Sequence, residues 1–164
     1  MVNIVKQNYS ENKKKYKKIE KELKKKLGEN VPISHVGSTA IPRMSGKNII
    51  DILIGAVDNK DFNKLSKEIV DLGYYKSRNN KETEYQFFAS KETETTAGDI
   101  HIHLAIKKTQ RYKDFIILRD YLLNNSNEAK LYIEVKKKIV TNKSKDRKIY
   151  KDMKSKYVDE LLKR

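Results

Sequence analysis

The sequence predicts an α+β fold in which a mixed β-sheet is flanked by an N-terminal helix and a helical C-terminal segment. The first observation behind this prediction is a series of short apolar runs between residues 31 and 106, with one helical pattern among them. The second is the region from residue 113 onward, where apolar residues recur only at helical spacing. No repeat or proline-rich linker divides the 164 residues, so we expect one domain over residues 1–164.

The first element is predicted to be an amphipathic helix over residues 10–27, with Ser10 as its N-cap and Gly28 as its C-terminal stop. Lysines fill the face opposite to its apolar stripe, which we interpret as a solvated surface. The stripe consists of Tyr16, Ile19, Leu23 and Leu27.

Two strands are expected next, over residues 31–36 and 48–57. The second is apolar on both faces, which predicts a central position in the sheet. A helix capped by Asp58 or Asn59 and ended by Gly73 follows. Its predicted buried stripe is Phe62, Leu65, Ile69 and Leu72.

The second half of the predicted sheet consists of strands over residues 74–77 and 85–89, separated by the polar turn 78–81. A loop over residues 91–98 leads to a last strand over residues 99–106, in which apolar and polar residues alternate.

Three helices complete the prediction, starting near Lys113, Ser126 and Asp146. Their apolar positions are Phe115, Leu118, Tyr121 and Leu122 in the first, Ala129, Tyr132, Val135 and Ile139 in the second, and Tyr150, Met153, Tyr157 and Leu161 in the third.

The composition narrows the function classes. The chain has no cysteine, which excludes disulfides, thiolate metal sites and a cysteine nucleophile. No signal-peptide run or bilayer-spanning apolar stretch is present, so we expect a cytoplasmic protein without a membrane partner. The net charge of +15 makes nucleic acid a possible partner, but only six of the 37 basic residues are arginine and most lysines fall on outward helix faces. Nucleic-acid binding is therefore not favoured.

The most informative stretch runs from His35 to Ile54, and it predicts a strand, a Gly-Ser turn and a second strand. The turn, at Gly37, Ser38 and Thr39, would present backbone N–H groups and a hydroxyl to an anion. Lys47 and Asp51 follow it closely and would supply a positive charge and a metal-binding carboxylate. Together they are the parts needed to hold a nucleoside triphosphate with its metal.

A second group of polar side chains lies on the last strand. Strand alternation places Asp99, His101 and His103 on one face, where histidines two residues apart can ligate one cation or flank one substrate. We expect both histidines to face the same cavity as Asp51, because the alternate residues of their strand are apolar and must meet the core. His35 either orients the Gly-Ser turn or packs beneath it.

These residues resemble the signature of the GrpB family. The resemblance is carried by the run His35-Val-Gly-Ser-Thr-Ala-Ile-Pro with Lys47-x-x-x-Asp51-Ile, and by His101-Ile-His103-Leu. It continues through the helical motifs at residues 118–122, 128–136 and 146–154, and so covers nearly the whole chain.

The resemblance implies a polymerase-β-like nucleotidyltransferase fold. It implies that Gly37 and Ser38 match the triphosphate-binding turn, and that Asp51 matches a metal-binding aspartate for Mg²⁺. The chain departs from the superfamily where a second carboxylate is usual, since Ile49 and Leu53 flank Asp51. Asp99, Glu84 or a histidine would have to substitute for that acid.

The leading hypothesis is a Mg²⁺-dependent enzyme that transfers a nucleotidyl or pyrophosphoryl group from a nucleoside triphosphate to an unknown small acceptor. Asp51, with Asp99 and His101 as further candidates, would hold the metal, Lys47 would neutralise developing charge, and His101 and His103 would serve as ligands or as acid and base. The residues predicted on the acceptor side are Arg119, Arg147 and Lys154. The alternatives are a catalytically silent nucleotide-binding or regulatory module, and a nucleic-acid-binding protein.

Overall fold

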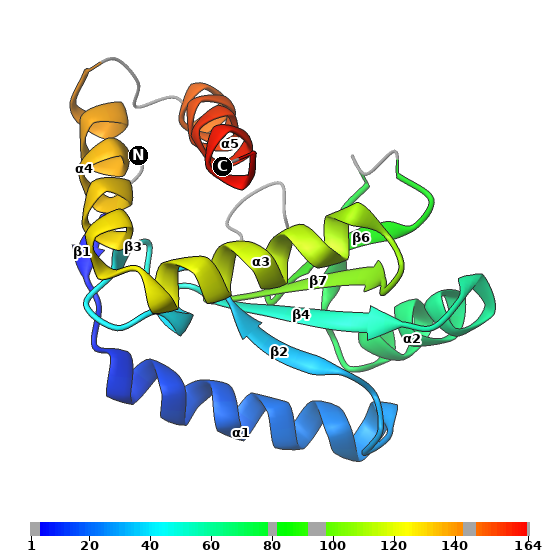
Figure 1. The fold of residues 1–164 in the computed structure, drawn as a ribbon. Helices are drawn as coiled ribbons and strands as arrows, with labels where there is room; N and C mark the ends of the chain where they lie inside the picture. Colours follow the sequence, from blue (N-terminus) through cyan, green and yellow to red (C-terminus); the bar gives the residue numbers. More distant parts are fainter. Residues whose placement is uncertain (1–3, 79–81, 92–97, 143–146, 164) are drawn as a thin grey trace.

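The computed structural model describes residues 4–78, 82–91, 98–142 and 147–163, and its central element is a five-stranded mixed sheet (Figure 1). The strand order is β2 (Ile33–Val36), β4 (Ile50–Ala56), β7 (Ile100–Ile106), β6 (Tyr85–Ala89) and β5 (Tyr75–Lys76). The β4 and β7 strands are parallel, and the other neighbours are antiparallel. The apolar strand β4 is internal, as predicted, and β7 lies directly beside it.

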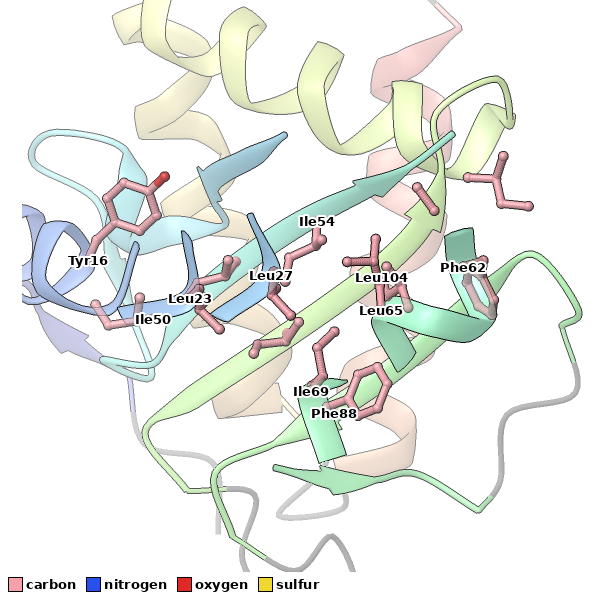
Figure 2. Close-up of a cluster of buried hydrophobic side chains, with 14 residues drawn as sticks. Tyr16, Leu23, Leu27, Ile50, Ile54, Phe62, Leu65, Ile69, Phe88 and Leu104 are labelled. Atoms are coloured by element: carbon pink, nitrogen blue, oxygen red, sulfur yellow. The ribbon is translucent and has the colours of Figure 1, made fainter. Parts of the chain in front are cut away.

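One face of the sheet is covered by α1 (Tyr9–Leu27) and α2 (Asn59–Asp71), and this layer contains the main core. Figure 2 shows Leu23 and Leu27 of α1 and Leu65 and Ile69 of α2 gathered over the sheet. Leu65 and Ile69 are fully buried, and burial of each such side chain contributes roughly 1.5–3 kcal/mol.

The opposite face of the sheet is covered by α3 (Gln110–Asn124) (Figure 1). Its Phe115 and Ile116 pack against Val36, Leu53 and Ala105 of the sheet. The helices α4 (Ser126–Asn142) and α5 (Arg147–Leu162) follow. A third apolar cluster joins these helices to the segment after β2 through Ile41, Met44, Leu122, Ala129 and Tyr132.

Two small elements beside the sheet were not predicted. The short strands β1 (Val5–Lys6) and β3 (Ser45–Gly46) pair with each other as an antiparallel ribbon. A single 3₁₀ turn, η1 (Ser38–Ala40), follows β2 where the Gly-Ser turn was expected. The β3 strand of the ribbon contacts η1, and η1 in turn contacts β4.

The helix boundaries correct several predictions. Asn8, not Ser10, caps α1, because its side chain accepts a hydrogen bond from the Glu11 N–H at 3.3 Å. Thr109 caps α3, which therefore begins three residues before Lys113. Asp58 caps α2 and Gly28 ends α1, as predicted.

Two predicted stripe positions are on the surface. Leu72, placed in the stripe of α2 by its spacing, is 37% exposed, because α2 ends at Asp71 and Leu72 is its C-cap. Met153 of α5 is 49% exposed. The predictions at 79–81, 92–97 and Asp146, and those for the side chains of Ile139 and Tyr150, lie outside the residues that the structure describes. Within the described ranges, no helix combines the length and apolarity needed to cross a bilayer.

Candidate functional site

The candidate site is built where Gly37, directly after β2, lies across the carboxylate of Asp51 in β4. Val36 pairs with Asp51 in the antiparallel register, so the two strands bring the turn and the carboxylate together. Gly37 has φ 72° and ψ −171°, a conformation that is essentially restricted to glycine. A Cβ atom on Gly37 would lie 2.3 Å from Asp51 Oδ2. The close approach and the backbone conformation therefore both require glycine here.

The segment after Gly37 is a single 3₁₀ turn closed by two backbone hydrogen bonds. The Ala40 N–H donates to the Gly37 carbonyl at 3.2 Å and the Ile41 N–H to the Ser38 carbonyl at 3.3 Å, which closes the 3₁₀ turn. The N–H groups that open such a turn, those of Ser38 and Thr39, have no acceptor within it. The first of them directly follows the glycine that lies against Asp51, so this end of the turn can receive a ligand oxygen.

Gln7 holds the Ser38 side chain from the N-terminal ribbon. Gln7 is buried, and its amide nitrogen contacts the Ser38 hydroxyl at 3.3 Å. With the amide turned so that both of its ends find partners, its oxygen accepts from Ser38 Oγ and from the Asn48 N–H, and its nitrogen donates to the Ser38 carbonyl. On the other side of Ser38, a Cβ on Gly46 would lie 2.3 Å from Ser38 Oγ. The ribbon therefore fixes the position of the Ser38 hydroxyl.

His35 and Thr39 hold the turn from below. The buried Thr39 hydroxyl donates to the Ile49 carbonyl at 3.1 Å, so its remaining contact, to His35 Nε2 at 2.9 Å, must be accepted from an N–H. Burial lowers the pKa of His35 to about 4, which keeps the ring neutral with its proton on Nε2. His35 thus packs beneath the turn and orients it. The Thr39 hydroxyl is engaged in the core and does not face a ligand.

Asp51 and the two histidines of β7 converge, as predicted. The parallel register pairs Asp51 with His101 and Leu53 with His103. Asp51 Oδ1 lies 3.3 Å from His101 Nδ1 and 3.5 Å from His103 Nε2. Burial opposes ionisation of Asp51, but hydrogen bonds from His101 and His103 outweigh it and hold the pKa of this carboxyl well below its usual range. The site therefore contains an ionised carboxylate with imidazole donors.

Tyr85 extends this network into β6. Its hydroxyl lies 2.8 Å from His103 Nδ1, and burial raises the pKa of Tyr85, so the phenol remains protonated and donates. His103 can then donate from Nε2 to Asp51, which gives a continuous series of hydrogen bonds from Tyr85 to Asp51. The rings of Phe87 and Phe115 lie 5.5 Å and 4.6 Å from that of His103 and confine it.

The residues present do not fit a two-metal magnesium centre. Mg²⁺ takes oxygen ligands in octahedral geometry, whereas Asp51 Oδ1 faces two imidazoles and Asp51 Oδ2 lies against Gly37. His101 Nε2 is buried and has no hydrogen-bond partner among the residues that the structure describes, and an imidazole nitrogen does not suit Mg²⁺. Within the described residues, no group of three or more His, Asp or Glu side chains is arranged to hold a metal ion.

The other candidates for a second acid lie elsewhere. Asp99 precedes β7 and its carboxylate accepts a hydrogen bond from Ser90 Oγ at 3.1 Å, at the exposed end of the strand. Glu84 lies at the opposite end of β7, since its carbonyl accepts from the Ile106 N–H. Ile106, which marks the position of Glu84, is five residues along the strand from His101, a distance of about 16 Å. The two histidines are therefore the side chains that stand beside Asp51.

The predicted basic residues are dispersed. Lys47 is half-buried between β3 and β4, near the turn. Arg119 of α3 lies beyond the outer edge of β2, where Nη1 donates to the His35 carbonyl at 3.4 Å and Nε to Asp120 at 2.8 Å. Arg147 and Lys154 belong to α5, but their side chains lie outside what the structure describes.

Sequence reasoning missed Lys136 of α4. This lysine is 2% exposed, donates to the Ser45 carbonyl of β3 and lies 4.7 Å from the ring centre of Tyr132. It links the C-terminal helices to the ribbon that holds Ser38. In a chain with so many solvated lysines its only sequence signal is its place on the same helix face as Tyr132 and Ala129.

Comparison with known proteins identifies the family. The family model described as GrpB protein matches residues 2–164, so the chain belongs to the GrpB family. The glutamate-rich protein GrpB of Alkalihalophilus pseudofirmus is 32% identical over 158 residues, which cover 94% of this chain and 91% of that protein. A UPF0157 protein of Pseudomonas aeruginosa is 35% identical over 104 residues, 63% of this chain and 43% of that protein. The match thus spans less than half of that relative.

Solved structures support the same fold. The conserved protein GrpB from Enterococcus faecalis aligns with a TM-score of 0.71 at 23% identity, over 94% of this chain and 99% of that one. The Cid1 poly(U) polymerase in its MgGTP-bound structure aligns with a TM-score of 0.52 at 13% identity, over 80% of this chain and 43% of that one. The fold is that of the polymerase-β-like nucleotidyltransferases, as predicted, and this likeness concerns the fold alone.

Proposed function

We propose that this protein binds a nucleoside triphosphate at the turn formed by Gly37 and Ser38, above the carboxylate of Asp51. The observation that carries the proposal is the close approach of Gly37 to Asp51 Oδ2. A Cβ atom added to Gly37 would lie 2.3 Å from that oxygen. This contact places the opening N–H groups of a 3₁₀ turn beside an ionised carboxylate, and the hydroxyl of Ser38 is held in place next to them.

The charge of Asp51 decides in which form the nucleotide binds. A phosphate oxygen about 5 Å from an ionised carboxylate is repelled by roughly 3 kcal/mol at an effective dielectric constant near 20. A divalent cation that accompanies the nucleotide removes this repulsion, and Lys47 reduces it further. We therefore infer that the ligand is the magnesium complex of the nucleotide, with the metal as part of the ligand. The structural neighbour Cid1 is recorded with MgGTP and with MgATP bound.

Nucleotidyl or pyrophosphoryl transfer to a small acceptor is the second candidate. It is favoured by the ionised state of Asp51 and by the imidazoles of His101 and His103, which can hold or move a proton beside it. Binding stands ahead of transfer because the described site offers one carboxylate where the superfamily usually has two.

Thermal unfolding and calorimetric titration with ATP, GTP, CTP and UTP, each with and without Mg²⁺, test the binding proposal. A ligand at a hundred times its Kd stabilises the folded state by about 2.7 kcal/mol, which is readily measured. The proposal requires a Mg²⁺-dependent increase in Tm with at least one nucleotide. No shift with any of the four at millimolar concentration would refute both nucleotide hypotheses.

Substitution of Asp51 by asparagine then tests the site. Asp51→Asn keeps the shape of the side chain and removes its charge, so nucleotide binding should become less dependent on Mg²⁺ while the protein remains folded. Asp71→Asn, an exposed carboxylate at the end of α2, is the matched control and should behave as the wild type. An unchanged Mg²⁺ dependence in Asp51→Asn would place the nucleotide elsewhere.

Two further measurements separate the remaining alternatives. With an α-labelled triphosphate and Mg²⁺, label on the acceptor would establish nucleotidyl transfer and a labelled nucleoside monophosphate would establish pyrophosphoryl transfer, whereas binding without turnover would establish the silent module. Affinity for RNA or duplex DNA that falls steeply with salt would instead favour the nucleic-acid hypothesis.

A further inference from the structure

A second candidate binding site lies on the far side of β2 from Asp51. A cavity of about 340 Å³ opens between α1, the outer edge of β2 and α3. The β2 strand is the edge of the sheet, and His35, which lines the cavity, is the neighbour of the residue that pairs with Asp51. The cavity therefore borders the candidate site but is separated from it by the backbone of β2.

The floor of the cavity is unsuited to an added β-strand. The Tyr16 hydroxyl lies 3.2 Å from the Ile33 carbonyl, and Arg119 Nη1 donates to the His35 carbonyl at 3.4 Å. These side chains cover two carbonyl groups on the outer edge of β2, which strand addition would require. The cavity fits a small molecule better than an extended peptide.

Three basic side chains and one carboxylate, that of Asp120, line the cavity, so its lining carries a net positive charge that favours an anion. Lys13 and Lys17 come from one face of α1, four residues apart, and Arg119 comes from α3 on the opposite wall. Glu20 pairs with Lys17 and lowers the repulsion between the two lysines, so the charge of Lys13 is the one on this helix face that most directly attracts an anion. Arg119 uses two of its donor groups on Asp120 and His35, and its planar guanidinium carries five N–H groups in all.

The walls are rigid. The rings of Tyr16 and His35 stack with centroids 4.5 Å apart and an angle of 8° between their planes. Tyr16 is buried, and its hydroxyl also lies 2.9 Å from Glu20, which in turn pairs with Lys17 at 2.7 Å. A wall fixed in this way orders Lys17 at the rim before a ligand arrives, so less conformational entropy is lost on binding.

We infer that the cavity between α1, β2 and α3 binds a small organic or inorganic anion that carries phosphate or carboxylate groups, held by Lys13, Lys17 and Arg119. This site is distinct from the proposed nucleotide site and does not depend on it. Occupancy would act on the Gly37 turn through His35, whose Nε2 proton bonds the Thr39 hydroxyl within that turn.

The test is a titration of the ¹⁵N-labelled protein with inorganic pyrophosphate, and in parallel with citrate, followed by amide chemical shifts. The inference predicts shifts at Ile33, Ser34 and Leu123, which line the cavity. In Lys13→Glu, the affinity derived from these shifts should fall about tenfold or more, as expected for reversal of one charge close to the ligand. The affinity should also decrease between low and high salt.

Lys15→Glu is the matched control, because it makes the same charge change on an exposed residue of the same helix, two positions along and hence on another face. The affinity of Lys15→Glu for either anion should differ from that of the wild type by less than about twofold. Equal losses in Lys13→Glu and Lys15→Glu, or no shifts at the cavity residues, would overturn the inference. If only one of the two probes causes shifts, the preferred group is phosphate for pyrophosphate and carboxylate for citrate. If the amide chemical shifts of Gly37 and Ser38 still change with pyrophosphate in Lys13→Glu, they result from binding at the proposed nucleotide site. The two proposals can therefore fail separately.

Discussion

Substitution of Gly37 by alanine tests the central contact of the site. The added Cβ would lie 2.3 Å from Asp51 Oδ2 and 2.9 Å from Asp51 Cβ, and real Cβ atoms do not approach so closely. A non-glycine residue at this φ and ψ also costs about 1–3 kcal/mol in backbone strain. If the carboxylate moves away, its hydrogen bonds with His101 and His103 weaken, each worth about 1.5–3 kcal/mol.

We therefore expect Gly37→Ala to lower the free energy of unfolding by about 3–5 kcal/mol. For a chain of this length, that corresponds to a decrease in Tm of roughly 6–20 °C. Urea denaturation followed by circular dichroism measures the first quantity, and a thermal scan measures the second. Nucleotide binding, if present, should be lost together with the geometry of the turn.

Gly73→Ala is the matched control for this experiment. Gly73 has φ 93°, so alanine is strained there as well, but an added Cβ would meet no atom of the described residues within 4 Å. Its cost should be about 1 kcal/mol, from the backbone alone. If Gly37→Ala lowers the free energy of unfolding no more than Gly73→Ala does, Gly37 does not lie in close contact with the Asp51 carboxylate and the reasoning is refuted.

Two further predictions follow from the hydrogen bonds around the site. Tyr85→Phe removes the donor 2.8 Å from His103 Nδ1 and should lower the free energy of unfolding, measured in urea, by about 1–3 kcal/mol. Tyr112 packs on the same face of the sheet, and Tyr112→Phe should change this free energy by less than about 0.5 kcal/mol. Equal effects of the two substitutions would contradict the role of Tyr85. In the folded protein His35 has a pKa of about 4, below the usual 6.5, so the unfolded chain binds more protons between these two pH values. The free energy of unfolding should therefore fall by about 1–3 kcal/mol as the pH decreases from 6.5 to 4. The pH dependence of unfolding in His35→Gln should lack this contribution, and an unchanged slope would show that His35 is not the group responsible.

The main sheet and its helices follow from patterns that are local in the sequence. The alternation in residues 100–106 places His101 and His103 on one face, and the continuous apolar run around Asp51 predicts an internal strand. The adjacency of β4 and β7 could not be derived in this way, because 43 residues separate the end of one strand from the start of the other and periodicity carries no information on pairing. The expectation of a single domain stays a prediction.

The parts of the site that sequence reasoning missed depend on tertiary contacts. The strands β1 and β3 have two residues each, too few for any periodicity, so the role of Gln7 beside Ser38 has no local signal. Lys136 is one lysine among many in the sequence of the predicted helix, although it is buried and donates to the Ser45 carbonyl. Tyr85 stands in a strand rich in aromatic residues, where its alternation with Phe87 is equally typical of packing.

The charge balance of the site is the reason for placing binding ahead of transfer in the proposed function. A centre built from two or three carboxylates repels itself and needs cations to be stable, whereas here a single carboxylate is satisfied by imidazole N–H donors. Burial opposes ionisation of Asp51, but the hydrogen bonds from His101 and His103 outweigh it and lower the pKa of the carboxyl. If the proposed function is correct, the cation of the bound nucleotide would compete with these two donors for Asp51 Oδ1. The strength of that competition, which Tyr85 modulates through His103, would set the affinity for the magnesium complex.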